Sequence, residues 1–235
     1  MNILAIDTAT NVMGVALTKD GILKGELVTN LQKNHSIRLM PAIDFLMDEI
    51  NMNPEDLDQI IVSKGPGSYT GIRIGLSTAK AMAWALDVPI IGVSSLEQLA
   101  FQGRNSSMLI SPFIDARRDS VFTGLYRFQG GELTLVVEEQ HVKMSDWLKL
   151  LEKQREHILF VSPDISLYKE EINRSLGDFA IMPGNSYQIG KPSDLIEIGK
   201  YKEEDEIHTL VPNYLRLTEA EANLIKTEKG NRKNE

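Results

Sequence analysis

The fold of this chain is decided by one stretch, Ser63-Lys64-Gly65-Pro66-Gly67-Ser68-Tyr69-Thr70-Gly71-Ile72-Arg73-Ile74-Gly75. The apolar run at residues 59–62 predicts a buried strand before it, and the apolar repeat over residues 72–86 predicts a helix after it. The glycines allow a tight turn, and Thr70 is a good N-cap residue. The stretch therefore predicts a strand, a glycine loop and a helix, an arrangement that can present backbone N–H groups to an anion.

The glycine spacing leaves two interpretations of this loop open. Gly65 and Gly71 are separated by five residues, whereas a Walker A loop has four and continues with Gly-Lys-Ser/Thr. The dinucleotide pattern Gly-x-Gly-x-x-Gly also fails by one residue. A turn that packs the helix on the sheet is the simpler interpretation. The alternative is a nucleotide site made of these residues: Asp7, Thr8, Gly67, Ser68 and Gly71.

The helix predicted over residues 72–86 is apolar on two faces. One face repeats Ile72, Leu76, Ala79, Ala83 and Leu86, and a second, weakly polar face repeats Ile74, Thr78, Ala81 and Ala85. A helix that is apolar on two sides is buried on two sides. The second side fits either a contact with another subunit or the interior of a core.

The composition narrows the class of protein. With 235 residues, 42% hydrophobic and 25% charged, the chain fits an ordinary soluble protein of one large domain or two small lobes. The absence of cysteine excludes disulfides and thiolate sites. No signal peptide and no apolar run of membrane-spanning length is visible, so we expect a cytoplasmic protein with no membrane contact. The net charge of -8 argues against a protein that grips nucleic acid by itself.

The opening pattern of the chain returns in its middle. Three-stranded meanders are expected at residues 3–7, 12–18 and 22–29, and again at residues 108–114, 120–128 and 133–141. In each, the first strand ends at or next to an acid, Asp7 or Asp115. The repetition predicts two lobes of the order β-β-β-α-β-α, as in actin, sugar kinases and heat-shock ATPases. We expect lobes at residues 1–104 and 105–225, the last segment of the second packing back on the first, and a disordered tail at residues 226–235.

Three motifs carry a resemblance to a known family: Ile-Asp-Thr-Ala at residues 6–9, the glycine loop at residues 65–75, and Pro-Asn-Tyr-Leu-Arg at residues 212–216. Asn34-His35-Ser36 fits the same family. With these motifs the sequence resembles the TsaB family, formerly YeaZ, bacterial relatives of Kae1 and TsaD, over residues 1–223. The resemblance implies an α/β fold of the two-lobed actin-like ATPase (ASKHA) class with duplicated mixed-sheet lobes.

The resemblance also implies a function in tRNA modification. TsaB proteins work with TsaD and TsaE to make N6-threonylcarbamoyladenosine next to the anticodon. The implied function is that of a non-catalytic scaffold and activator with no cofactor of its own, since ATP and metal belong to TsaD and TsaE. A heterodimer with TsaD, a homodimer without it, and tRNA contact only through the complex are expected. The alternative is an independent ATP-binding or peptidase-like enzyme of the same fold.

Individual residues agree with a chain that is not the catalyst. A TsaD-like metal site needs two histidines four apart on a helix, and the histidines, which are His35, His141, His157 and His208, contain no such pair. We therefore expect no metal and no catalytic residue. Asp7 and Asp115 fit either capping of the following turn or ligand binding, and Arg117 and Arg118 could simply be solvated.

The resemblance places the contact with TsaD on two helices, at residues 36–51 and 72–86. Both carry more apolar surface than one core needs. Pro41 lies inside the first and predicts a kink or a frayed first turn. The expected interface residues are Met40, Ile43, Met47, Ile74, Thr78 and Met82.

Overall fold

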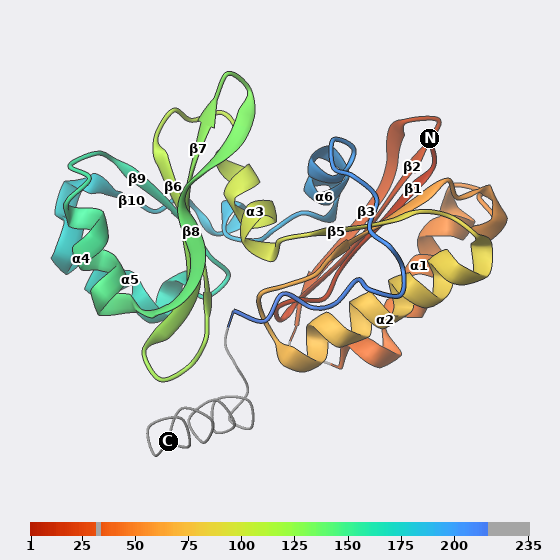
Figure 1. Ribbon diagram of the computed structural model, residues 1–235, viewed down its shortest axis with the longest axis horizontal. Helices are drawn as coiled ribbons and strands as arrows, with labels where there is room; N and C mark the ends of the chain where they lie inside the picture. The colour runs from red at the N-terminus through yellow and green to blue at the C-terminus, as the bar shows by residue number, and fades with distance from the viewer. Residues whose placement is uncertain (32–33, 216–235) are drawn as a thin grey trace, which may run out of the picture.

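The computed structural model describes residues 1–31 and 34–215 (Figure 1). Its strands and helices are β1 (Ile3–Asp7), β2 (Val12–Lys19), β3 (Ile22–Asn30), α1 (Leu39–Glu49), β4 (Gln59–Ser63), α2 (Tyr69–Leu86), β5 (Ile90–Val93), α3 (Ser95–Ala100), β6 (Leu109–Asp115), β7 (Ser120–Gln129), β8 (Glu132–Lys143), α4 (Met144–Glu152), β9 (Ile158–Val161), α5 (Ile165–Leu176), β10 (Ala180–Ile181) and α6 (Pro192–Gly199). A 3-10 turn, η1 (His35–Ile37), precedes α1. The tail expected at residues 226–235 lies outside the described residues.

Two five-stranded mixed sheets share one topology. The first has the order β3-β2-β1-β4-β5, and the second, followed in the matching direction, has the order β8-β7-β6-β9-β10. In each sheet the first strand of the chain pairs antiparallel with the second and parallel with the fourth. This duplication confirms the predicted two-lobed, actin-like α/β fold.

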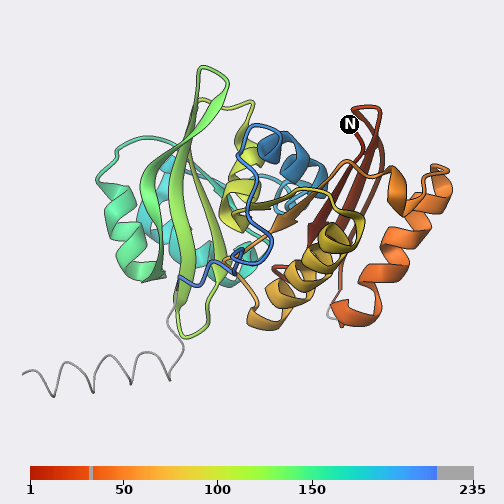
Figure 2. The same cartoon turned by 45° about the vertical axis from the view of Figure 1, so that its right-hand side comes forward.

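Side chains of the first sheet point alternately into two cores, because successive residues of a strand face opposite sides. Leu4 and Ile6 of β1 pack in the core that contains α1 and α2. Ile3 and Ala5 pack with Leu195 of α6 in a second core. The first sheet is therefore covered by α1 and α2 on one face and by α6 on the other (Figures 1 and 2).

The second sheet is covered in the same way. Phe113 packs with Trp147 of α4 and Ile172 of α5 on one face. On the other face, Ile110 and its neighbours pack with Leu96 of α3. One covering helix is therefore exchanged between the two sheets. Helix α3 follows the first sheet in sequence but covers the second, and α6 follows the second sheet but covers the first. The division expected at residues 104 and 105 stays a prediction, because each half contributes a helix to the other.

Two helix starts differ from the prediction. The side chain of Ser68, not Thr70, accepts a hydrogen bond from the Gly71 backbone N–H, so α2 begins at Tyr69. The predicted helix over residues 36–51 is divided into η1 and α1, and Asn34 caps the former. Pro41 falls in the first turn of α1, where its missing N–H costs no intrahelical hydrogen bond. It therefore does not interrupt the helix.

Candidate functional site

A cleft of about 630 Å³ lies where loops of the first half, which carries the first sheet, meet loops of the second half, which carries the second sheet. From the first half it is lined by the β1–β2 turn at Thr10 and by the glycine loop at Gly67 and Ser68. From the second half it is lined by Asp115 and Arg117 after β6. Asp164 and the segment of residues 213–215 complete the lining. The turns that follow β1 and β6, the first strands of the two meanders, therefore meet at one cavity.

The glycine loop is packed tightly against the turn that follows β1. The backbone N–H of Ser68 donates to the carbonyl oxygen of Ala9 at 2.6 Å. A Cβ atom at Gly67 would lie 2.1 Å from that same oxygen, and one at Gly71 would lie 2.2 Å from the carbonyl oxygen of Thr8. These glycines are therefore required for close approach of the loop and α2 to the first hairpin. Some of the backbone N–H groups of the loop are therefore already engaged in hydrogen bonds within the protein.

Asp7 and Thr8 are almost fully buried. The Thr8 hydroxyl donates to the carbonyl oxygen of Gly71 at 2.7 Å, and the Asp7 carboxylate accepts from the Ala9 N–H at 2.9 Å. Burial raises the pKa of the Asp7 carboxyl, against hydrogen bonds from Ala9, Gln98 and Ser63 that favour the ionised form. Asp7 thus caps the turn after β1. Of the five nucleotide-site candidates, Gly67 and Ser68 line the cleft and Asp7, Thr8 and Gly71 pack beneath it; a binding role for any of them stays a prediction.

The second half presents a tight, charged turn to the cleft. Arg117, Arg118 and Asp119 all have φ between 55° and 65°, in the left-handed region that is costly for residues other than glycine. The Asp115 carboxylate accepts from the Arg117 N–H at 3.2 Å and from the Tyr168 hydroxyl at 2.8 Å. Asp115 therefore caps its turn as Asp7 does. Burial raises the pKa of the neighbouring Asp164 carboxyl.

The outward surfaces of α1 and α2 form a second candidate site. Both helices lie along the same face of the first sheet (Figure 2). Met40 on α1 is exposed, whereas Ile74, Thr78 and Met82 on α2 are half-buried. Ile43 and Met47 are 1% and 4% exposed and belong to the core. Their assignment to an exposed interface is wrong, because the core stripe of α1 runs through them.

Two exposed aromatic side chains on the same helices escaped the sequence analysis. Trp84 on α2 is 71% exposed and Phe45 on α1 is 53% exposed. Trp84 follows Arg73 and Ser77 at helical spacing, which puts it on the outward side of α2. The sequence does carry a signal for this position, a large tryptophan among the small residues of the helix. We call Met40, Phe45, Ile74, Thr78, Met82 and Trp84 the docking face.

Within residues 1–31 and 34–215, no group of three or more His, Cys, Asp or Glu side chains is placed to hold a metal ion. Within the same residues, no helix combines the length and the apolar composition that a membrane span requires.

Comparison with known proteins finds relatives that are named for tRNA modification. The sequence model of the TsaD family, tRNA N6-adenosine threonylcarbamoyltransferase, matches residues 26–185. The tRNA threonylcarbamoyladenosine biosynthesis protein TsaB of Bacillus subtilis is 48% identical over 229 residues, which is 97% of this chain and 100% of the relative. The Escherichia coli protein of the same name is 35% identical over 130 residues, 54% of this chain and 55% of the relative.

Solved structures agree with these sequence relatives. A Pseudomonas aeruginosa protein described as similar to peptidase YeaZ superposes with a TM-score of 0.80 at 26% identity, over 92% of this chain and 99% of the other. YeaZ from the same organism superposes with a TM-score of 0.75 at 25% identity, over 91% and 99% of the two chains.

Proposed function

Since the chain belongs to the TsaB family of tRNA threonylcarbamoyladenosine biosynthesis proteins, we propose that it is a non-catalytic subunit that binds and activates TsaD and supports TsaE. In this proposal TsaD transfers the threonylcarbamoyl group, and ATP and the metal ion belong to TsaD and TsaE. The chain meets tRNA only within the complex, in the cytoplasm.

The docking face is the observation that carries the proposal. Trp84, Phe45 and Met40 are large apolar side chains that stand about half or more in solvent on two neighbouring helices. Their two helices lie along the same face of the first sheet (Figure 2), and an apolar surface on that side is the kind that a partner protein covers. Two helices of a TsaD-like partner would complete a four-helix contact of ordinary interface size, on the order of 1,600 Å² in total.

The same surface accounts for a second expected state. A face that fits two similar helices of a relative also fits two helices of a second copy, in a two-fold arrangement. In the absence of TsaD we therefore propose a homodimer through the docking face. TsaD would displace the second copy, so the homodimer and the heterodimer exclude each other.

The test uses exposed positions, because charge at the half-buried Ile74 or Met82 would also disturb the core. We would replace Met40→Glu and Trp84→Glu singly, with Lys149→Glu on α4, exposed in the second half, as the matched control. Binding to TsaD is measured by calorimetry and tRNA modification by the reconstituted complex. Each docking-face variant is expected to lose at least about tenfold in affinity. Wild-type affinity in both would show that TsaD binds elsewhere.

A further inference from the structure

An arginine at the start of α2 is held in place by two tyrosines. The guanidinium carbon of Arg73 lies 3.9 Å from the centre of the Tyr69 ring. The Nε–H of Arg73 donates to the hydroxyl of Tyr214 at 2.7 Å. The two tyrosine rings stack with their centres 5.5 Å apart and their planes at 25°. Arg73 is therefore preorganised, although it stands on the surface of the protein.

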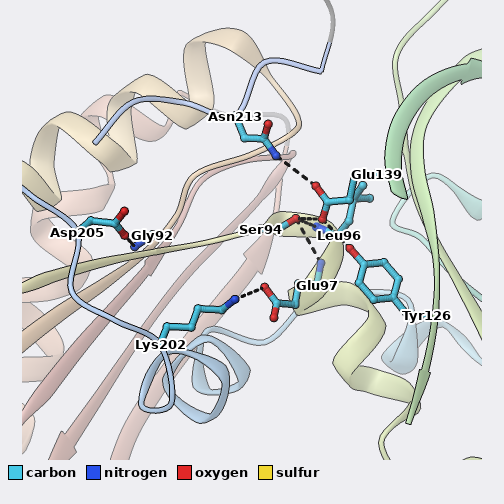
Figure 3. Close-up of polar contacts among 9 residues, drawn as sticks. All are labelled: Gly92, Ser94, Leu96, Glu97, Tyr126, Glu139, Lys202, Asp205 and Asn213. Carbon is cyan, nitrogen blue, oxygen red and sulfur yellow. Dashed lines mark hydrogen bonds and ion pairs between the residues drawn. The ribbon is translucent and has the colours of Figure 1, made fainter. Parts of the chain in front are cut away.

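Tyr214 comes from a segment that crosses the first half of the protein, residues 200–215, which we call the strap. Asp205 pairs with Ile90 at the free edge of β5, and its carboxylate accepts from the Gly92 N–H at 2.8 Å (Figure 3). Lys202 pairs with Glu97 at 3.0 Å. These contacts fasten the beginning of the strap to the first sheet and to α3.

The rest of the strap runs beside α2. Lys80 of α2 donates to the carbonyl oxygen of Leu210 at 2.9 Å, and the Leu210 side chain is buried in the core. The Asn213 N–H donates to the carbonyl oxygen of Lys64 at 2.7 Å. The fixed backbone at Asn213 therefore holds the next residue, Tyr214, against Arg73. Because Arg73 is held in turn, its side chain loses little conformational entropy on binding.

Arg73 is also part of a shallow groove of about 500 Å³ between η1 and α2. The groove is lined by Ser36, Tyr69, Thr70, Arg73, Ile74, Ser77 and Thr78. Arg73 is the charged member of this lining, and the others are mostly hydroxyl side chains. Within the described part of the chain, Arg73 has no carboxylate partner. The groove shares Ile74 and Thr78 with the docking face, so a protein seated on that face reaches the groove.

We propose that Arg73 binds a carboxylate side chain of the partner protein that seats on the docking face, and that Tyr214 is the positioning residue for this contact. The proposal rests on the proposed function, because it names a polar anchor for that same surface. A guanidinium offers a planar fork that pairs with a carboxylate through two hydrogen bonds. Arginine and tyrosine are also the residues that most often dominate binding at interfaces.

The surroundings favour a carboxylate of a protein over a phosphate of RNA. The chain has a net charge of -8, and the exposed positions of α1 and the end of α2 include Asp44, Asp48 and Asp87. One arginine among these acids cannot hold a polyanionic backbone, which needs several cations. One arginine is sufficient for a single carboxylate within a mostly apolar contact.

The experiment measures the affinity of purified TsaD for three variants by calorimetry, at low and high salt. Arg73→Met removes the charge, Arg73→Lys keeps the charge without the fork, and Tyr214→Phe removes only the hydroxyl that positions Arg73. We expect about 10- to 100-fold weaker binding for Arg73→Met with a flatter salt dependence, and about 3- to 10-fold for the other two. Lys149→Met, at an exposed position of α4, is the control and is expected to bind as wild type.

Each outcome has one meaning. If Arg73→Met and Tyr214→Phe bind TsaD as wild type while Trp84→Glu does not, the carboxylate contact is wrong and the proposed function stands. If Trp84→Glu also binds as wild type, TsaD binds elsewhere and the assignment of the docking face fails as well, whereas a wild-type chain that does not bind TsaD overturns the proposed function. If Arg73→Met keeps its affinity for TsaD but weakens tRNA binding by the assembled complex, the guanidinium binds a phosphate of the tRNA and the proposal is overturned. Unfolding midpoints of all variants are compared first, and if Arg73→Met unfolds, Tyr214→Phe decides.

Discussion

The side-chain amide of Asn213 donates a hydrogen bond to the carboxylate of Glu139 across 3.2 Å and joins the strap to the edge strand β8 of the second sheet (Figure 3). The same carboxylate accepts hydrogen bonds from the hydroxyl of Ser94, the N-cap of α3, and from the hydroxyl of Tyr126 at 2.5 Å. One acid therefore contacts groups from the first half, the second half and the strap. Burial, then the charge of Glu139, raises the pKa of the Tyr126 hydroxyl, which stays a donor.

The first prediction concerns this contact. Glu139→Ala would leave the buried hydroxyl of Tyr126 without its acceptor, and we expect a loss of about 1–3 kcal/mol in the free energy of unfolding. In a double-mutant cycle with Tyr126→Phe, the coupling energy is expected to be about 1 kcal/mol. Urea denaturation measures both. The exposed neighbour Glu138→Ala is the control, expected within about 0.5 kcal/mol; equal stability of the two alanine variants would contradict the prediction.

The second prediction concerns the glycine loop. A Cβ atom at Gly71 would lie 2.2 Å from the carbonyl oxygen of Thr8, so Gly71→Ala must push α2 away from the first hairpin. We expect a loss of more than about 2 kcal/mol in urea denaturation. Gly184→Ala, where a Cβ atom would meet nothing within 4 Å, is expected to change the stability by less than about 0.5 kcal/mol. A tolerated Gly71→Ala would refute the packing role of this glycine.

The third prediction concerns pH. Burial raises the pKa of the Asp194 carboxyl on α6 to about 6, despite an ion pair with Arg104 at 3.3 Å. The unfolded chain releases this proton near pH 4, so the folded protein holds more protons between about pH 4 and 6. The contribution of Asp194 to stability is therefore highest below about pH 4 and falls as the pH rises towards 6.

Asp194→Asn removes this titration. Relative to wild type, the variant should gain about 2–3 kcal/mol in the free energy of unfolding between pH 4 and pH 7. The measurement is urea denaturation of both proteins at the two pH values. The contributions of the other carboxyl groups to the pH dependence then cancel in the difference between the two proteins. Parallel pH profiles of the two proteins would mean that Asp194 titrates normally in the folded state.

The fourth prediction concerns nucleotide. The glycine loop uses the Ser68 and Gly71 N–H groups internally, bonding them to Ala9 and to the Ser68 hydroxyl. We therefore expect the isolated protein to bind Mg-ATP no more tightly than about 1 mM, measured by calorimetry. A dissociation constant in the micromolar range would instead support the nucleotide site considered for Asp7, Thr8, Gly67, Ser68 and Gly71.

The sequence was sufficient for the two meanders because each carries its own local signals. Apolar runs bounded by turns such as Asp20-Gly21 and Gly130-Gly131 define strands without help from the rest of the chain. The duplicated topology then follows from repeating the same order. The N-cap of α2 was a different matter, because Ser68 and Thr70 are equally suitable in isolation and tertiary packing decides between them.

The sites were harder to predict because they depend on contacts between distant residues. Periodicity marks Ile43 and Met47 as apolar, but it does not say which side of α1 meets the sheet. Nothing local relates Arg73 to Tyr214, which lies 141 residues further on. The last segment was expected to pack back on the first lobe, but nothing in the sequence places the strap beside α2.

The exchange of α3 and α6 affects the order in which the chain can fold during synthesis. The first sheet has all five of its strands once Val93 has been made, yet the face that carries Ile3 and Ala5 is covered by a helix that begins only at Pro192. If the first sheet forms while the chain grows on the ribosome, one of its faces stays bare and apolar until α6 emerges. The native fold must then be completed late and by both halves together, and the interval is a window in which a chaperone would find its target.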